Sequence, residues 1–184
     1  SLYQSMRNAT RHNLQKLRDG LSRLPATTVS LASRVLEREE EILRRFHGLL
    51  ALRVSAARIR CHGDYGLGQV LHTGKDFMIV DFEGHLGQSM SERRIKRLVL
   101  RDVTGMLCSF RYAAGTALAR QVELGGLGAS TQDRADRWAA CWRLWSSVAF
   151  LKGYLNALDQ SSLLPARDED VQALLEIYQL HRMV

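Results

Sequence analysis

The 184-residue chain has only three cysteines and two prolines. Three cysteines do not support the disulfide framework of a small secreted domain. The cysteines, Cys61, Cys108 and Cys141, are odd in number and far apart, and no pair has the short spacing of a zinc or redox motif. No apolar run approaches the length of a membrane span, and the first residues do not resemble a signal peptide. We therefore expect reduced thiols, a cytoplasmic location and no membrane partner.

The positive charge of the chain is concentrated in its first third. Residues 1–60 hold 12 Lys/Arg and 5 Asp/Glu, whereas residues 61–184 hold 14 of each. The basic residues follow helical periods and alternate with glutamates, which is typical of a solvated helix face. Since no basic stripe is formed, we expect no nucleic-acid partner.

Hydrophobic periodicity predicts a mainly α-helical chain of the α+β class with a small β element. Helices are expected over residues 2–21, 30–52, 91–97, 102–118, 131–158 and 168–182, and short strands over 57–61, 69–71 and 77–81. Thr73-Gly74-Lys75 is a hairpin signal between the last two strands, and Ser91 is the expected cap of the helix that follows. The length favours a single domain over residues 1–184.

Three tryptophans, Trp138, Trp142 and Trp145, recur at spacings of four and three residues along the helix expected over 131–158. This spacing places them on one helix face. A sugar-stacking platform is one interpretation of such a stripe. Packing in the core is the preferred one, because three indoles together form a large apolar surface.

The β element contains the most informative motif. His62-Gly63-Asp64 is followed five residues after Asp64 by Gln69, and a second carboxylate, Asp81, follows an apolar strand-like run. Carboxylate and amide oxygens suit Mg²⁺, which uses few protein ligands together with phosphate and water. In phosphoryl transfer one carboxylate accepts the proton of the attacking hydroxyl, while the other donors hold the metal ion. Each residue alone has an ordinary explanation in a turn or a strand end, but the joint pattern predicts a phosphotransferase site.

Several further segments of the chain, outside this motif, carry a resemblance to a known family. The segments are residues 3–8 (Tyr-Gln-Ser-Met-Arg-Asn), 57–65, 67–71, 73–77, 81–84, 91–94 and 100–103. On these residues the chain resembles the aminoglycoside-phosphotransferase branch of the protein-kinase-like superfamily. Within that branch it resembles the maltokinases, including the maltokinase-like region fused to bacterial trehalose synthases. The resemblance covers most of residues 3–115 and implies a protein-kinase-like C-terminal lobe whose β element carries the catalytic and metal-binding loops.

The resemblance also implies an activity and a set of roles. The reaction would be ATP-dependent phosphorylation of maltose, or of a related sugar, at its anomeric hydroxyl to give maltose 1-phosphate. Asp64 would be the catalytic base and His62 a supporting residue of the catalytic loop. Gln69 and Asp81 would bind Mg²⁺ and, through it, ATP.

Further positions near the motif bear on the substrate. The resemblance implies substrate-side or supporting positions for Glu83 and Arg101. The chain departs from the family pattern at Gly66, where a histidine is usual, and at His85-Leu86, where Glu-Pro is common. Because both departures flank the expected site, a phosphotransferase for another sugar or an amino-alcohol is the alternative.

No glycine-rich nucleotide loop and no strand-borne lysine for the phosphates precede residue 62. Gly125-Gly126-Leu127-Gly128 lies between expected helices, where a connector is the usual meaning. We therefore expect the C-terminal lobe of a longer polypeptide, inactive without an N-terminal nucleotide-binding lobe. A fused or associated trehalose synthase is the expected protein partner. A non-catalytic accessory domain is the remaining alternative, but a purely structural lobe would not need the two carboxylates and the amide together.

Overall fold

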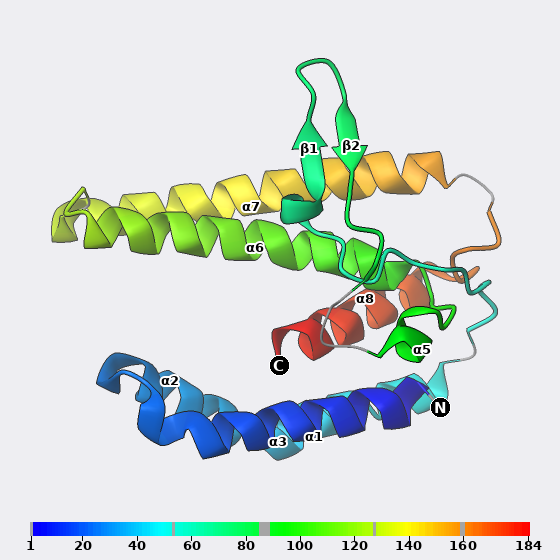
Figure 1. Cartoon of the computed structure of the whole chain (residues 1–184), viewed down its shortest axis with the longest axis horizontal. Coiled ribbons are helices and arrows are strands. Elements are labelled where there is room, and N and C mark those ends of the chain that lie inside the picture. Colours follow the sequence, from blue (N-terminus) through cyan, green and yellow to red (C-terminus); the bar gives the residue numbers. More distant parts are fainter. Residues whose placement is uncertain (1, 53, 85–88, 127, 159–160) are drawn as a thin grey trace. The chain divides into compact units, whose positions relative to one another are not determined.

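The computed structural model describes residues 2–52, 54–84, 89–126, 128–158 and 161–184. The chain divides into two compact units, residues 1–55 with 165–184 and residues 56–164, and each is described by itself. Helices dominate both units, and the described residues contain one two-stranded sheet (Figure 1). None of the helices in the described part of the chain has the length and apolarity needed to cross a membrane.

The first unit is entirely helical in its described residues. Its elements are α1 (Leu2–Gly20), the 3₁₀ helix η1 (Leu21–Arg23), α2 (Ala26–Leu36), α3 (Glu39–Arg45), α4 (Gly48–Ala51) and α8 (Asp168–Met183). Its buried apolar side chains come from four of these helices or their ends: Met6, Leu14, Ala32, Ile42, Phe46, Leu174, Ile177 and Tyr178. The helices predicted over 2–21 and 168–182 are confirmed to within a residue.

The single helix predicted over 30–52 is wrong, because the chain forms three shorter helices there. The breaks fall at residues 37–38 and 46–47, where the backbone closes three-residue turns, for example from Arg38 N–H to the Val35 carbonyl at 3.1 Å. Packing explains the second break. Phe46 is completely buried, and its ring contacts His181 of α8 edge-on with centroids 6.2 Å apart. Gly48 directly follows this break, whereas no glycine or proline lies beside the first one.

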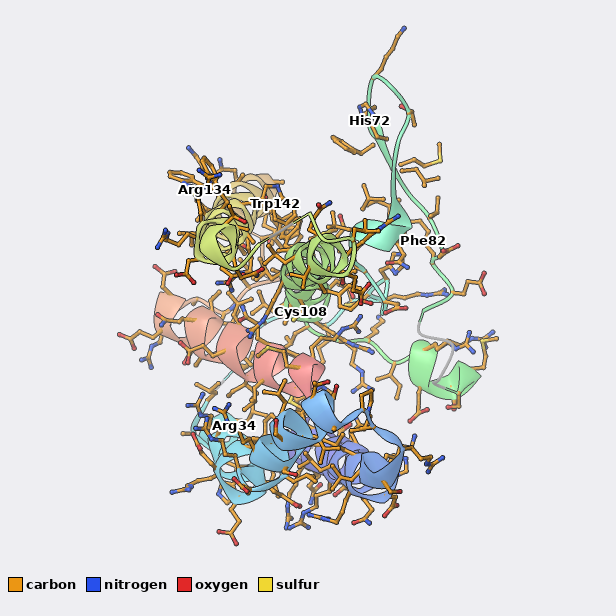
Figure 2. The ribbon with its side chains drawn as sticks, turned by 90° about the vertical axis from the view of Figure 1, so that its left-hand side faces the viewer. Arg34, His72, Phe82, Cys108, Arg134 and Trp142 are labelled. Carbon is orange, nitrogen blue, oxygen red and sulfur yellow. The ribbon has the colours of Figure 1, made fainter. Side chains whose placement is uncertain are left out.

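The second unit is built on two long antiparallel helices, α6 (Leu100–Glu123) and α7 (Ala129–Ala157), which pack side by side (Figure 1). Before them lie the 3₁₀ turn η2 (Leu67–Gln69), the strands β1 (Val70–His72) and β2 (Phe77–Ile79), and α5 (Met90–Arg93). The strands pair antiparallel, with Val70 opposite Ile79, which confirms the predicted hairpin. His72 lies on this hairpin, which projects from the two helices (Figure 2).

Two local predictions in this unit are wrong. The cap of α5 is Ser89 rather than Ser91, because Ser89 and Glu92 form a reciprocal capping box. The strand predicted over 57–61 is reduced to one bridge between Ile59 and Arg97. No ladder forms because the Ala57 N–H instead donates to the Ser162 carbonyl at 2.7 Å, so neighbouring residues pair with different segments.

The tryptophan stripe does not pack into the core. Trp138, Trp142 and Trp145 are 69%, 46% and 67% exposed, so the preferred interpretation is wrong. The ring of Trp142 contacts that of Phe110 edge-on, with centroids 6.0 Å apart. Alanines of α6 and α7 face each other beneath Trp138 and Trp142 and leave an apolar groove of about 580 Å³. In the predicted connector, Gly125, Gly126 and Gly128 lie between the two helices, while Leu127 lies outside the described residues.

Candidate active site

The loop of residues 62–66 is anchored to the first turn of α6. Asp102 accepts hydrogen bonds from the backbone N–H groups of His62, at 2.6 Å, and Gly63, at 3.0 Å. Both oxygens of the carboxylate are used, one for each N–H. Gly63 has φ +87°, a conformation that glycine adopts without strain, and this allows two successive N–H groups to face one carboxylate. The loop therefore holds Asp64 on a fixed backbone.

The ring of His62 links the two halves of the site. Its Nε2 lies 2.7 Å from the Val80 carbonyl, which can only accept, so Nε2 carries the proton. Its Nδ1 then accepts from the N–H of Asp64 at 3.4 Å. The ring also contacts that of Phe82, with centroids 5.0 Å apart. One imidazole thus connects Asp64 to the residues on both sides of Asp81.

Asp81 follows β2 in a strained backbone conformation. Its φ is +62°, and it is the one non-glycine residue with positive φ among the residues that the structure describes. Such conformations cost about 1–3 kcal/mol and are found most often where function requires a particular side-chain direction. The preceding N–H, from Val80, donates to the Gln69 carbonyl at 2.9 Å. The hairpin therefore returns Asp81 to the start of β1, where Gln69 lies.

The backbone of the loop of residues 62–66 also packs closely against α6. A Cβ at Gly105 would overlap the carbonyl oxygen of Tyr65. At the next turn of the helix, the hydroxyl of Ser109 accepts a hydrogen bond from the N–H of Leu67 at 3.1 Å. Glycine at position 105 thus lets the backbones of α6 and the loop approach closely, and the Ser109 hydroxyl adds a hydrogen bond one turn further on.

Glu83 and Arg101 have different polar contacts. Arg101 donates to the carbonyl of Gly63 at 3.4 Å, so it contacts the loop of residues 62–66. The backbone carbonyl of Glu83 accepts from Arg93 of α5 at 3.5 Å. Their substrate roles stay predictions. The departure at His85-Leu86 lies outside the described residues.

The anionic carboxylate of Asp102 affects neighbouring acids. Burial, followed by the negative charge of Asp102, raises the pKa of the Cys61 thiol from 9.0 to about 11. The same two causes raise the pKa of Tyr154 from 10.0 to about 12 and also raise that of Tyr65. Cys61 is therefore a neutral thiol at physiological pH, which fits a structural rather than a reactive cysteine.

The donors are suited to Mg²⁺ but do not form a complete cage. No group of three His, Cys, Asp or Glu side chains that could hold a metal ion occurs among the described residues. Mg²⁺ is commonly bound by one or two carboxylates with phosphate oxygens and water, and the oxygens of Gln69 and Asp81 are donors of that kind. The oxygen donors of Gln69 and Asp81 therefore suit Mg²⁺ chemically.

Sequence reasoning missed the residues of α6 that hold the loop. The sequence places Asp102 at an expected helix start and in the resembling segment 100–103, without indicating its contact with the loop, and it does not single out Gly105 or Ser109. Asp102 lies 40 residues after His62, so periodicity along the chain gives no sign of their contact. An acidic residue in the first turn of a helix has an adequate local explanation in the helix dipole.

These features confirm the predicted, mainly helical fold with a small β element, and the chain shares this fold with part of a solved sugar kinase. No family model matches the chain. Among solved structures it is similar to a glucosamine kinase in complex with glucosamine, ADP and inorganic phosphate, with 20% identity and a TM-score of 0.71. It is also similar to glucosamine kinase in two further crystal forms, with 19% and 20% identity and TM-scores of 0.70 and 0.67. These matches cover 98% of this chain but only 39–40% of those proteins, so the chain spans about two fifths of their length.

Proposed function

We propose that this chain is the catalytic C-terminal lobe of an ATP-dependent sugar kinase. The observation that carries the proposal is the double contact of the His62 ring, which joins the backbone of Asp64 to the carbonyl of Val80. A candidate base and a candidate metal-binding carboxylate, Asp81, thereby share one fixed arrangement. The shared fold with glucosamine kinase supports the same conclusion.

The mechanism assigns a separate task to each side chain. The acceptor hydroxyl approaches Asp64, whose carboxylate takes its proton as the oxygen bonds to the γ-phosphorus and ADP leaves. His62 orients the backbone of Asp64, and Asp102 holds the loop on α6. Mg²⁺, when bound, neutralises charge on the phosphates, and the oxygens of Gln69 and Asp81 would hold it. Positioning supplies much of the rate in this reaction class.

Two acceptors are supported by different observations. The sequence resemblance to maltokinases favours maltose, phosphorylated at its anomeric hydroxyl. The similarity to a glucosamine kinase that binds glucosamine favours an amino sugar as the second candidate. Gly66, which replaces the usual histidine beside the loop, is consistent with an acceptor other than maltose.

The test is sugar-dependent ADP release by the protein with its proposed N-terminal lobe present. Maltose and glucosamine are supplied separately, and Asp64→Asn is the control in each assay. We expect release with one of the two sugars and its loss in Asp64→Asn. A folded protein that binds nucleotide but releases no ADP with either sugar would contradict the proposed acceptors.

The remaining alternative is a non-catalytic lobe associated with a trehalose synthase. Metal binding separates the two proposals, because an accessory lobe has no need for the donors at Gln69 and Asp81. A fused or associated trehalose synthase also stays a prediction within the catalytic proposal. A cytoplasmic location, where ATP is available, belongs to the same proposal.

A further inference from the structure

Gly66 and Ser109 form a point of close contact between η2 and α6. Gly66 is buried, and a Cβ built on it would lie 3.2 Å from the Cβ of Ser109. Few Cβ atoms have neighbours this close, so a residue larger than glycine would require the turn or Ser109 to shift by a few tenths of an ångström. The backbone of Gly66 is extended, with φ −170°, a conformation open to every residue. Packing against Ser109, rather than backbone conformation, therefore favours glycine at this position.

The hydroxyl of Ser109 uses this proximity to hold the turn. Its Oγ accepts from the N–H of Leu67 at 3.1 Å and donates to the carbonyl of Met106 at 2.7 Å. Oγ also lies 3.5 Å from the sulfur of Met106. Since a hydroxyl has one proton, donation to α6 leaves its lone pairs for the turn. The side chain is thus a bridge between the helix and the first residue of η2.

The same turn carries the amide proposed to bind Mg²⁺. The N–H of Gln69 donates to the Gly66 carbonyl at 3.1 Å, and its own carbonyl accepts from Val80 at 2.9 Å. A Cβ on Gly66 would lie 3.5 Å from Oε1 of Gln69. The turn is therefore fixed by Ser109 at its start and by the hairpin at its end, with the Gln69 amide against Gly66.

We propose that Ser109 is a positioning residue for Oε1 of Gln69, acting through its hydrogen bond to Leu67, and that Gly66 is required for this contact. The inference rests on the proposed function, in which Gln69 binds Mg²⁺. A histidine at position 66, as in the family pattern, would bring a Cβ against Ser109.

Ser109→Ala tests the role of the hydroxyl, because alanine keeps the Cβ that packs against Gly66. Ser147→Ala is the matched control, since Ser147 also bonds a carbonyl of its own helix, that of Arg143 at 2.7 Å, but on α7. Amide hydrogen exchange of Leu67 is measured in the free chain. Affinity for Mn²⁺, as a probe for Mg²⁺, is measured by electron paramagnetic resonance on the full-length protein with a non-hydrolysable ATP analogue, alongside affinity for the metal-free analogue.

In Ser109→Ala we expect faster exchange at Leu67 and Mn²⁺ affinity lower by about three- to ten-fold, the effect of one hydrogen bond. Affinity for the metal-free analogue should not change, whereas general damage to the lobe would lower both affinities. Gly66→Ala should lower Mn²⁺ affinity in the same way, and Ser147→Ala should change nothing.

Unchanged exchange at Leu67, or equal Mn²⁺ affinity in Ser109→Ala and the wild type, would overturn the inference and leave the proposed function intact. A wild-type protein that binds neither Mn²⁺ nor nucleotide would instead overturn the proposed function and this inference together.

Discussion

Asp102 binds the backbone of the loop of residues 62–66 with both carboxylate oxygens, at 2.6 Å from the backbone nitrogen of His62 and 3.0 Å from that of Gly63. The carboxylate lies in the first turn of α6, a long helix with a buried N-terminal half. The loop therefore takes its position from the core of the second unit. Hydrogen bonds to a charged acceptor contribute about 1.5–3 kcal/mol each, so this double contact is a substantial anchor for the loop.

Asp102→Asn should weaken this anchor without changing the size of the side chain. The amide nitrogen of asparagine cannot accept, so one of the two loop N–H groups loses its partner. We expect a loss of about 1–3 kcal/mol in the free energy of unfolding, measured with urea, and a clear fall in turnover. Asp133→Asn, at an exposed position of α7, is the control and should change stability by less than about 0.5 kcal/mol. Equal effects in the two variants would remove the special role of Asp102.

Gly105→Ala should separate helix propensity from packing against the loop. In the interior of a helix, alanine is favoured over glycine by up to about 1 kcal/mol. At Gly105 the added Cβ would overlap the Tyr65 carbonyl, so we expect a net loss of about 1–3 kcal/mol. Gly115→Ala, on the same helix, has no atom within 4 Å of the new Cβ and should stabilise the chain. Thermal unfolding of the two variants gives the comparison. A stabilised Gly105→Ala would show that the loop does not depend on this contact.

Asp64→Asn should abolish turnover while leaving the fold intact. The general base of such a reaction contributes about 10²–10⁴-fold to the rate, and the side chain of Asp64 is half-buried at the end of the anchored loop. We expect turnover of the full-length protein to fall by that factor, with the urea midpoint nearly unchanged. An unchanged rate would exclude Asp64 as the base.

The sequence predicted the parts of the fold that depend on local signals. Thr73-Gly74-Lys75 marked the hairpin, and the limits of α8 followed from its apolar period. The capping box of Ser89 and Glu92 is also present in the sequence, as a serine three residues before a glutamate, although Ser91 was the expected cap. These elements form because neighbouring residues determine them.

The parts that could not be predicted depend on distant contacts. The bend at Phe46 exists because its ring is buried against α8, more than 120 residues further along the chain. The contact of Asp102 with His62 joins a helix start to a loop. The exposure of Trp138 depends on the alanines that face it across the groove. Periodicity identifies an apolar stripe, but it does not say what lies opposite.

Alkaline pH should destabilise the second unit through Cys61. Its pKa is raised in the folded chain to about 11, chiefly by burial and then by Asp102, from an ordinary value of 9.0. Below pH 9 both the folded and unfolded chains keep the thiol protonated, so this contribution to stability is fully present. Between pH 9 and about 11 the unfolded chain ionises first, and stability falls as pH rises.

Cys61→Ser should therefore flatten the decline in unfolding free energy between pH 9 and 11, because serine does not ionise in this range. Cys141→Ser, at an exposed position, should leave the decline unchanged. Tyr154→Phe extends the test, since the pKa of Tyr154 is raised from 10.0 to about 12 and its contribution is lost in that higher window. Urea unfolding at half-unit pH steps measures all three variants. If Cys61→Ser kept the full slope, the thiol would titrate alike in the folded and unfolded chains, and Asp102 and burial would exert no net effect on it.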